Sequence, residues 1–183
     1  MSSPRAALLV KVDTLGDLVL AAPTLRALRA AWPDTRLVVV IRRAYLDLAP
    51  LLAPGAEWLA TTLDPFNCSP HADPAELSRL RAAVTALSPE IVAAATSRRN
   101  WLEIALAAAA PTARRLALGA GAQDEFFDTQ LRVQLGLDST HAFPEKLPTP
   151  DGEPDWQRNF RLADALLDRA VERTPPNFQA PAA

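Results

Sequence analysis

The first residues able to do chemistry form a short polar segment near the start of the chain, Asp13-Thr14-Leu15-Gly16-Asp17. A carboxylate such as Asp17 can take a proton from a substrate hydroxyl group. Gly16 lets a ligand approach the backbone closely, and Thr14 offers a hydroxyl group. An aspartate at the start of a helix is also a natural capping residue. The spacing alone favours capping for Asp17 over catalysis and leaves both interpretations open.

The segment must be positioned by the elements on either side of it. Ala6–Val12 is a short apolar run that predicts a buried parallel strand, and Leu18–Trp32 has apolar residues at helical spacing. Arg36–Ile41 predicts a second buried strand. Strand, helix and strand together form a βαβ unit, which is right-handed by default. Residues 13–17 therefore lie at the positive end of a helix dipole, beside free backbone N–H groups.

The alternation of strands and helices continues along the chain. Further strands are expected at Glu57–Thr61, Glu90–Ala95 and Arg114–Leu118, and further helices at Ala44–Leu52, Pro74–Leu87 (capped by Asp73), Arg98–Ala110 and Trp156–Arg173. This pattern predicts an α/β protein, an open parallel sheet with helices on both faces. Ligands of such sheets bind beyond the carboxyl ends of the strands.

Basic and polar residues stand at several of these strand ends. Lys11 lies near the end of the first strand. Arg42 and Arg43 follow the second strand, and Ser97, Arg98 and Arg99 follow the fourth. These five residues are candidates for holding an anionic substrate. The alternative for each arginine is an ordinary solvated side chain.

The chain divides into three regions. Residues 1–140 are expected to form a Rossmann-like domain, although Asp124–Leu135 fits a strand or a helix equally well. Residues 141–173 are expected to be a linker and a crossing helix, because His141–Pro154 holds four prolines. Residues 174–183 are rich in proline and alanine and are expected to be disordered.

Composition excludes several classes of protein. The net charge of −2 gives no support for a nucleic-acid partner, and no apolar stretch is long enough to span a bilayer. Cys68 is the only cysteine, so no internal disulfide can form, which fits a cytoplasmic protein. His71 and His141 do not form a metal-ligand cluster with Cys68. The glycine fingerprints of dinucleotide-binding and P-loop proteins are absent from the first turn, which disfavours a nucleotide-dependent oxidoreductase.

Residues Leu8–Arg43 resemble the opening of glycosyltransferase family 9, the heptosyltransferases of lipopolysaccharide core synthesis and their relatives. The resemblance is carried by Lys11, Gly16, Asp17, Pro23, Leu25, Leu28, Trp32 and Pro33. A weaker match covers Pro89-Glu90, Ser97-Arg98-Arg99 and Arg114–Gly119. His141–Leu167 is similar to the segment that crosses into the second domain of this family.

The resemblance implies one Rossmann-like lobe of a bacterial enzyme with the two-lobed GT-B architecture. Such an enzyme transfers a sugar from a nucleotide donor, often ADP-heptose, to a glycan acceptor without a metal or another cofactor. It implies that Asp17 is the general base and that Asp13 and Thr14 approach the donor. Lys11 either offsets phosphate charge or merely lines the strand end. The residues at the other strand ends hold an anionic acceptor: Arg42, Arg43, Ser97, Arg98 and Arg99.

The donor-binding lobe of the family lies in its C-terminal half, which these residues do not include. The chain alone is therefore expected to be inactive without a missing or separate donor lobe, and peripheral membrane contact is possible. A different class remains open: a stand-alone, non-catalytic module that binds a sugar or a protein.

Overall fold

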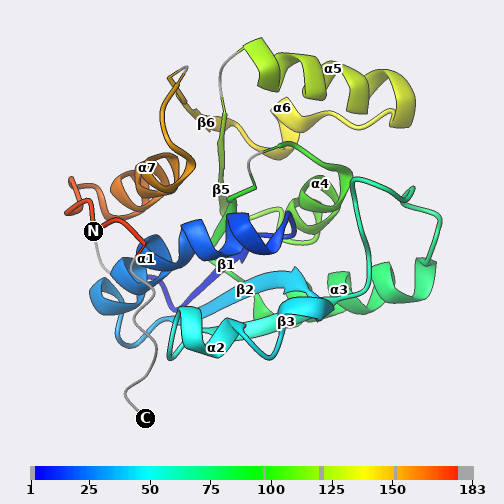
Figure 1. Cartoon of the computed structure of the whole chain (residues 1–183). Coiled ribbons are helices and arrows are strands. Elements are labelled where there is room, and N and C mark those ends of the chain that lie inside the picture. The colour runs from blue at the N-terminus through cyan, green and yellow to red at the C-terminus, as the bar shows by residue number, and fades with distance from the viewer. Residues whose placement is uncertain (1–2, 97, 120–121, 151, 177–183) are drawn as a thin grey trace.

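The protein is built around one six-stranded parallel sheet with the strand order β3-β2-β1-β4-β5-β6 (Figure 1). The computed structural model describes residues 3–96, 98–119, 122–150 and 152–176. The strands are β1 (Ala6–Val10), β2 (Arg36–Arg42), β3 (Glu57–Thr61), β4 (Ile91–Ala94), β5 (Arg114–Leu118) and β6 (Glu145–Leu147). Because β1 lies between β2 and β4, all five of its residues are buried. The predicted α/β class and open parallel sheet are confirmed.

Helices cover both faces of the sheet, as the alternating pattern predicted. They are α1 (Leu15–Ala31), α2 (Ala49–Leu52), α3 (Pro74–Leu87), α4 (Trp101–Ala108), α5 (Ala122–Leu135), α6 (Ser139–Ala142) and α7 (Asp155–Leu167), and a 3-10 turn spans Arg43–Tyr45. Helices α1, α2 and α7 pack on one face, and α3, α4 and α6 on the other. None of the helices within these described residues is long and apolar enough to cross a membrane.

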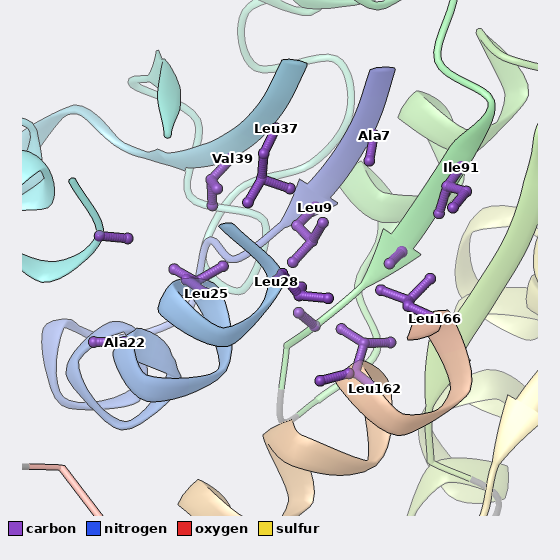
Figure 2. Packing of buried hydrophobic residues seen from close by; sticks show 14 of the residues in the cluster. Ala7, Leu9, Ala22, Leu25, Leu28, Leu37, Val39, Ile91, Leu162 and Leu166 are labelled. Atoms are coloured by element: carbon purple, nitrogen blue, oxygen red, sulfur yellow. The ribbon is translucent and has the colours of Figure 1, made fainter. Parts of the chain in front are cut away.

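Alternate side chains of β1 supply the two hydrophobic cores. Leu9 points to the face covered by α1 and α7, where Leu28 and Leu162 meet it (Figure 2). Leu8 and Val10 point to the opposite face and pack among residues of α3 and α4. This double burial holds the carboxyl end of β1 in a fixed position, and the polar segment that follows starts from that point.

The segment expected to be a linker contains regular structure, which corrects the sequence interpretation. Residues Glu145–Leu147 form β6, which pairs in parallel with β5 at the edge of the sheet. Pro144 and Pro148 stand just outside this strand. Proline is tolerated there because an edge strand needs ladder hydrogen bonds on one side only.

Two other uncertain regions are clear in the structure. The undecided segment Asp124–Leu135 belongs to helix α5. Helix α7 ends at Leu167, before the expected Arg173, because Asp168 adopts a left-handed conformation with φ 52°. Residues 174–176 have no regular structure, and the rest of the predicted tail, 177–183, lies outside the described residues.

Glu76 in the first turn of α3 gives a prediction for stability at acid pH. Its carboxylate accepts hydrogen bonds from Arg79 at 2.6 and 2.8 Å. The Arg79 guanidinium is the largest cause that lowers the pKa of Glu76 from 4.5 to about 2. A carboxyl group with a lowered pKa stabilises the fold above its unfolded pKa, and this contribution is lost as the pH falls from 4.5 toward 2. Glu76→Gln should therefore cost about 0.5–1 kcal/mol at pH 6 and almost nothing near pH 2.

Urea unfolding of wild type and Glu76→Gln between pH 6 and pH 3 measures this difference. The exposed Glu172→Gln is the matched control and should follow wild type. A deficit in Glu76→Gln that stays constant with pH would show that the carboxylate charge does not matter.

Candidate active site

The polar segment after β1 forms a helix cap whose members are Thr14 and Asp17. Helix α1 begins at Leu15, three residues before the expected start, and Thr14 is its N-cap. The Thr14 hydroxyl oxygen accepts from the Asp17 backbone N–H at 3.3 Å. In return, Asp17 Oδ2 accepts from the Thr14 N–H at 3.1 Å and from its hydroxyl at 2.7 Å. Asp17 is therefore the acidic partner of a capping box, and the cap itself is Thr14.

The capping box leaves half of the Asp17 carboxylate available. The side chain is partly exposed, and Oδ1 has no hydrogen-bond partner within the described part of the chain. A partly exposed carboxylate with one oxygen held by its own helix and the other not engaged in a hydrogen bond is suited to accept a proton.

Gly16 leaves open space beside Asp17. The residue is exposed and has no positive φ angle, so the helix does not require glycine there. A Cβ atom added to it would meet only the Thr14 hydroxyl oxygen, at 3.6 Å, an ordinary contact. The room at Gly16 is therefore free for an approaching molecule.

Lys11 and Asp13 are buried at the base of the loop, each 3% exposed. Lys11 Nζ donates to the Ala95 carbonyl oxygen at 2.7 Å and lies 3.1 Å from Asp13 Oδ2. Ala95 directly follows β4. The buried ion pair thus joins the carboxyl ends of the two central strands, below the site rather than on its surface.

The two arginines after β2 have different environments. Arg42 forms a bidentate ion pair with Asp64 at 2.8 and 2.9 Å, and its Nε donates to the Val12 carbonyl oxygen at 2.7 Å. Arg43 is exposed, and within the described residues it has no ion pair. Of the two, Arg43 is the cation that a ligand can reach directly.

Arg98 lies at the end of β4 between two aromatic rings. Its guanidinium is 5.2 Å from the ring centre of Phe66 and 4.7 Å from that of Phe127. The residue is exposed and lines a cavity of about 330 Å³, together with Asn67, Asn100 and Gln130. Ser97, the neighbouring candidate, lies outside the described residues.

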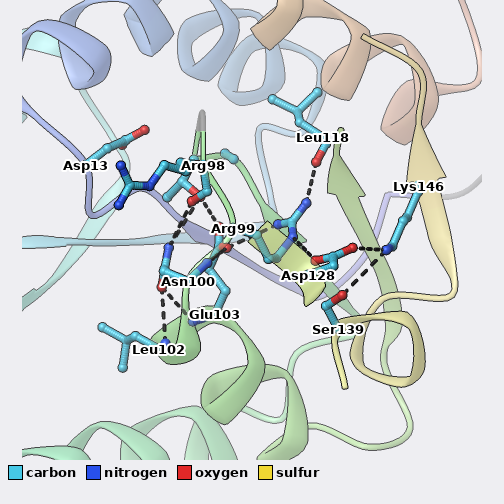
Figure 3. A network of polar contacts seen from close by, with 12 residues as sticks. Asp13, Arg98, Arg99, Asn100, Leu102, Glu103, Leu118, Asp128, Ser139 and Lys146 are labelled. Carbon is cyan, nitrogen blue, oxygen red and sulfur yellow. Dashed lines mark hydrogen bonds and ion pairs between the residues drawn. The ribbon is translucent and has the colours of Figure 1, made fainter. Parts of the chain in front are cut away.

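Arg99 points the other way, into the interior, and is 3% exposed. Its guanidinium lies 3.1 Å from Glu103 and donates to the Leu118 carbonyl oxygen (Figure 3). Glu103 also accepts from the Thr96 hydroxyl and the Asn100 N–H. Burial raises the pKa of the Glu103 carboxyl, and the Arg99 charge opposes that rise. Arg99 therefore has a structural role beneath the site, because its buried side chain links Glu103 of α4 to the end of β5.

Sequence reasoning missed Phe66, Phe127 and Glu103. The two phenylalanines lack a local signal, because they lie far from Arg98 in the sequence. Glu103 had one: it stands three residues after Asn100, the spacing of a capping box, and the structure shows that box. Within the described chain, no group of three or more His, Cys, Asp or Glu residues is placed to hold a metal ion.

A hollow of about 490 Å³ lies at the opposite edge of the sheet, beside Trp32, Glu90 and Arg114. None of the sequence-predicted site residues lines it. Open parallel sheets bind their ligands at the carboxyl edge. The smaller cavity at Arg98 and the loop at Asp17, which share that edge, therefore define the candidate site.

Together, the parallel sheet, the strand order and the loop after β1 define a Rossmann-like α/β lobe. Its fold is that found in GT-B glycosyltransferases. The chain is similar to a glycosyl transferase family 9 structure from Veillonella parvula, with a TM-score of 0.62 and 16% identity over 93% of this chain and 43% of that one. It is also similar to E. coli heptosyltransferase WaaC with ADP-2-deoxy-2-fluoro heptose, with a TM-score of 0.62 and 16% identity over 94% of this chain and 51% of that one.

A second WaaC structure, with ADP, gives a TM-score of 0.61 at 15% identity over 95% of this chain and 50% of that one. This chain thus spans about half the length of the solved structures that it matches. No protein-family model and no curated protein matches the sequence. At this level of identity, the similarity establishes the fold, and the resemblance to family 9 seen in the sequence agrees with it.

Proposed function

We propose that this chain is the acceptor-binding lobe of a metal-independent glycosyltransferase with Asp17 as the general base. The enzyme would transfer a heptose-like sugar from a nucleotide-sugar donor such as ADP-heptose to a glycan acceptor. The observation that carries the proposal is the Asp17 carboxylate itself. It stands at the carboxyl edge of the sheet, partly exposed, with Oδ2 fixed by Thr14 and Oδ1 without a hydrogen-bond partner among the described residues.

The chemistry follows from that geometry. Asp17 Oδ1 accepts the proton of an acceptor hydroxyl group while the hydroxyl oxygen attacks the anomeric carbon of the donor sugar. The new glycosidic C–O bond forms as the bond to the nucleoside diphosphate breaks, and the diphosphate leaves with the bonding electron pair. Thr14 holds the carboxylate in place, and the space beside Gly16 admits the reacting groups.

The cations at the same edge support an anionic acceptor. The Arg98 guanidinium lies near two aromatic rings, in a cavity whose lining includes the amide residues Asn67, Asn100 and Gln130. Guanidinium groups bind carboxylates and phosphates, and amides bind sugar hydroxyl groups. Arg43 provides a second accessible cation. The donor contacts would come mainly from a second lobe that is not part of these residues.

The alternative is a non-catalytic, stand-alone module that binds a sugar or protein at the same edge. One observation favours it: Asp17 already has a structural role in the capping box. The two functions differ in whether they depend on the negative charge of the Asp17 carboxylate. A binding module would keep its affinity when Asp17 loses that charge, whereas an enzyme would lose turnover.

Gly16→Ala tests the proposed function without disturbing the fold. The chain has room for the new Cβ atom and a backbone conformation that alanine adopts. The free energy of unfolding should therefore stay constant or increase by about 0.4–1 kcal/mol. Transfer should fall by about a hundredfold, because the methyl group displaces the acceptor from Asp17 by about 1 Å.

The assay uses the chain together with its donor-binding lobe, ADP-heptose as the first donor, and carboxylated or phosphorylated glycans as acceptors. The matched control is Ala27→Gly, a change in the opposite direction later in the same helix, which should lower stability but not the specific rate of folded protein. Full transfer activity in Gly16→Ala would place the reacting groups elsewhere.

A further inference from the structure

Helix α5 is held to the body of the protein by few contacts. It lies at the periphery of the fold, beyond α6 and β6 (Figure 1). None of its described side chains, residues 125–135, is fully buried, whereas α7 buries five residues. Gly119 before it has a φ angle of 99°, and Gly136 after it has a φ angle of 67°. A helix with little buried surface and a glycine near each end can move as a unit.

Among the described side chains of α5, Asp128 makes the ion pairs that join the helix to the rest of the protein. Asp128 Oδ2 pairs with Lys146 of β6, as Figure 3 shows. Asp128 Oδ1 faces Arg99 Nε at 3.9 Å. Within the described residues, both of these atoms are buried and lack a hydrogen-bond partner. An inward shift of about 1 Å would bring them to hydrogen-bonding distance.

The position of α5 sets the shape of the Arg98 cavity. Phe127, next to Asp128, stacks on Arg98 and forms part of the cavity wall. Leu131, one turn further along α5, lines the same cavity, as does Cys68. If α5 moved away, Arg98 would lose one of its two rings, and the cavity would open to solvent.

We propose that Asp128 is a positioning residue that latches α5 over the Arg98 cavity, and that α5 opens and closes as a unit. The latch goes beyond the proposed function, on which it rests only for the identity of the ligand beneath α5. In the closed position, Asp128 forms ion pairs with Lys146 and Arg99, and the Phe127 ring contacts the Arg98 guanidinium. In the open position, Arg98 is free to receive a ligand.

Cys68 can report this motion, because it is partly buried and lines the same cavity as several residues of α5. The rate of its reaction with the thiol reagent DTNB reports how often α5 opens. Asp128→Asn should raise this rate by at least about tenfold, because it removes the charge of a hydrogen bond that holds the helix. Lys146→Met should act in the same direction. Thr129→Ala, on the exposed side of α5, is the matched control and should leave the rate unchanged.

Hydrogen exchange separates a latch from a general loss of stability. In Asp128→Asn, amides of α5 should exchange faster while those of β1 and β4 keep their wild-type rates. An unchanged Cys68 reaction, or equally faster exchange in β1, would overturn the proposal. Neither measurement needs a sugar donor. Absence of transfer activity would therefore count against the proposed function and not against the latch.

Discussion

Asp17→Asn is expected to lower the rate of sugar transfer by about 10²–10⁴-fold, the usual contribution of a general base. The amide keeps the shape of the carboxylate, and its oxygen still accepts from the Thr14 N–H, but it cannot take a proton. The loss should appear in kcat, because the substituted side chain still occupies the same space. The measurement is a steady-state transfer assay on the chain together with its donor-binding lobe.

The same substitution weakens the cap of α1, so stability must be measured alongside it. Loss of the Asp17 charge should cost about 1 kcal/mol of unfolding free energy, which leaves the protein folded. Asp34→Asn, an exposed carboxylate just beyond the other end of α1, is the matched control and should keep full activity. Undiminished turnover in folded Asp17→Asn would reduce Asp17 to a capping residue and favour the non-catalytic alternative.

Arg99→Met is expected to have the largest effect on stability, a loss of about 3–5 kcal/mol. Methionine fills much of the space of arginine but leaves the Glu103 carboxylate buried without its cation. Glu103 is fully buried, and Arg99 is the positively charged group beside it. The loss is measured as the change in urea unfolding free energy at pH 8.

The pH dependence of this loss follows from the direction of the Glu103 shift. Burial raises its pKa above 4.5, so the folded state binds a proton more tightly than the unfolded state does. Stability from such a group is present at low pH and falls as the pH rises above 4.5. Without Arg99 the pKa rises further, so the deficit of Arg99→Met should be smaller at pH 5 than at pH 8.

The double variant Arg99→Met/Glu103→Gln checks the cause. Replacing both partners of a buried ion pair often costs little, so the double variant should recover much of the lost stability. If it were as unstable as Arg99→Met, the loss would come from packing against Phe143 rather than from the unpaired carboxylate.

Sequence patterns predicted the elements that carry clear end signals. Helix Pro74–Leu87 was predicted with its observed bounds because Asp73 and Pro74 mark its start. Strands Glu57–Thr61 and Arg114–Leu118 also match. Strand β6 was missed because three residues between prolines show no alternation. Its partner β5 lies 29 residues earlier in the chain, counted between the paired residues Leu116 and Glu145.

The site was predictable only in part. The loop at Asp17 was found because strand, turn and helix are consecutive in sequence. Arg98 and Arg99 are adjacent and of the same type, so no local rule shows that Arg98 is exposed and Arg99 buried. Phe66 and Phe127 are brought to Arg98 by the tertiary fold, which no local sequence pattern shows.

The place of β1 in the sheet has a consequence for biosynthesis. Its residue Ala7 pairs with Leu37 on one side and with Ile91 on the other. During translation, β1 is synthesised before the other five strands. The residue that pairs with Ala7 on one side follows about thirty residues later. The residue that pairs with it on the other side follows more than fifty residues after that. Until then one edge of it stays open, and a ribosome-bound chain is exposed there to wrong pairing and to chaperones. Slow codons placed after Ala94 would therefore help the nascent lobe more than slow codons placed before Ile91.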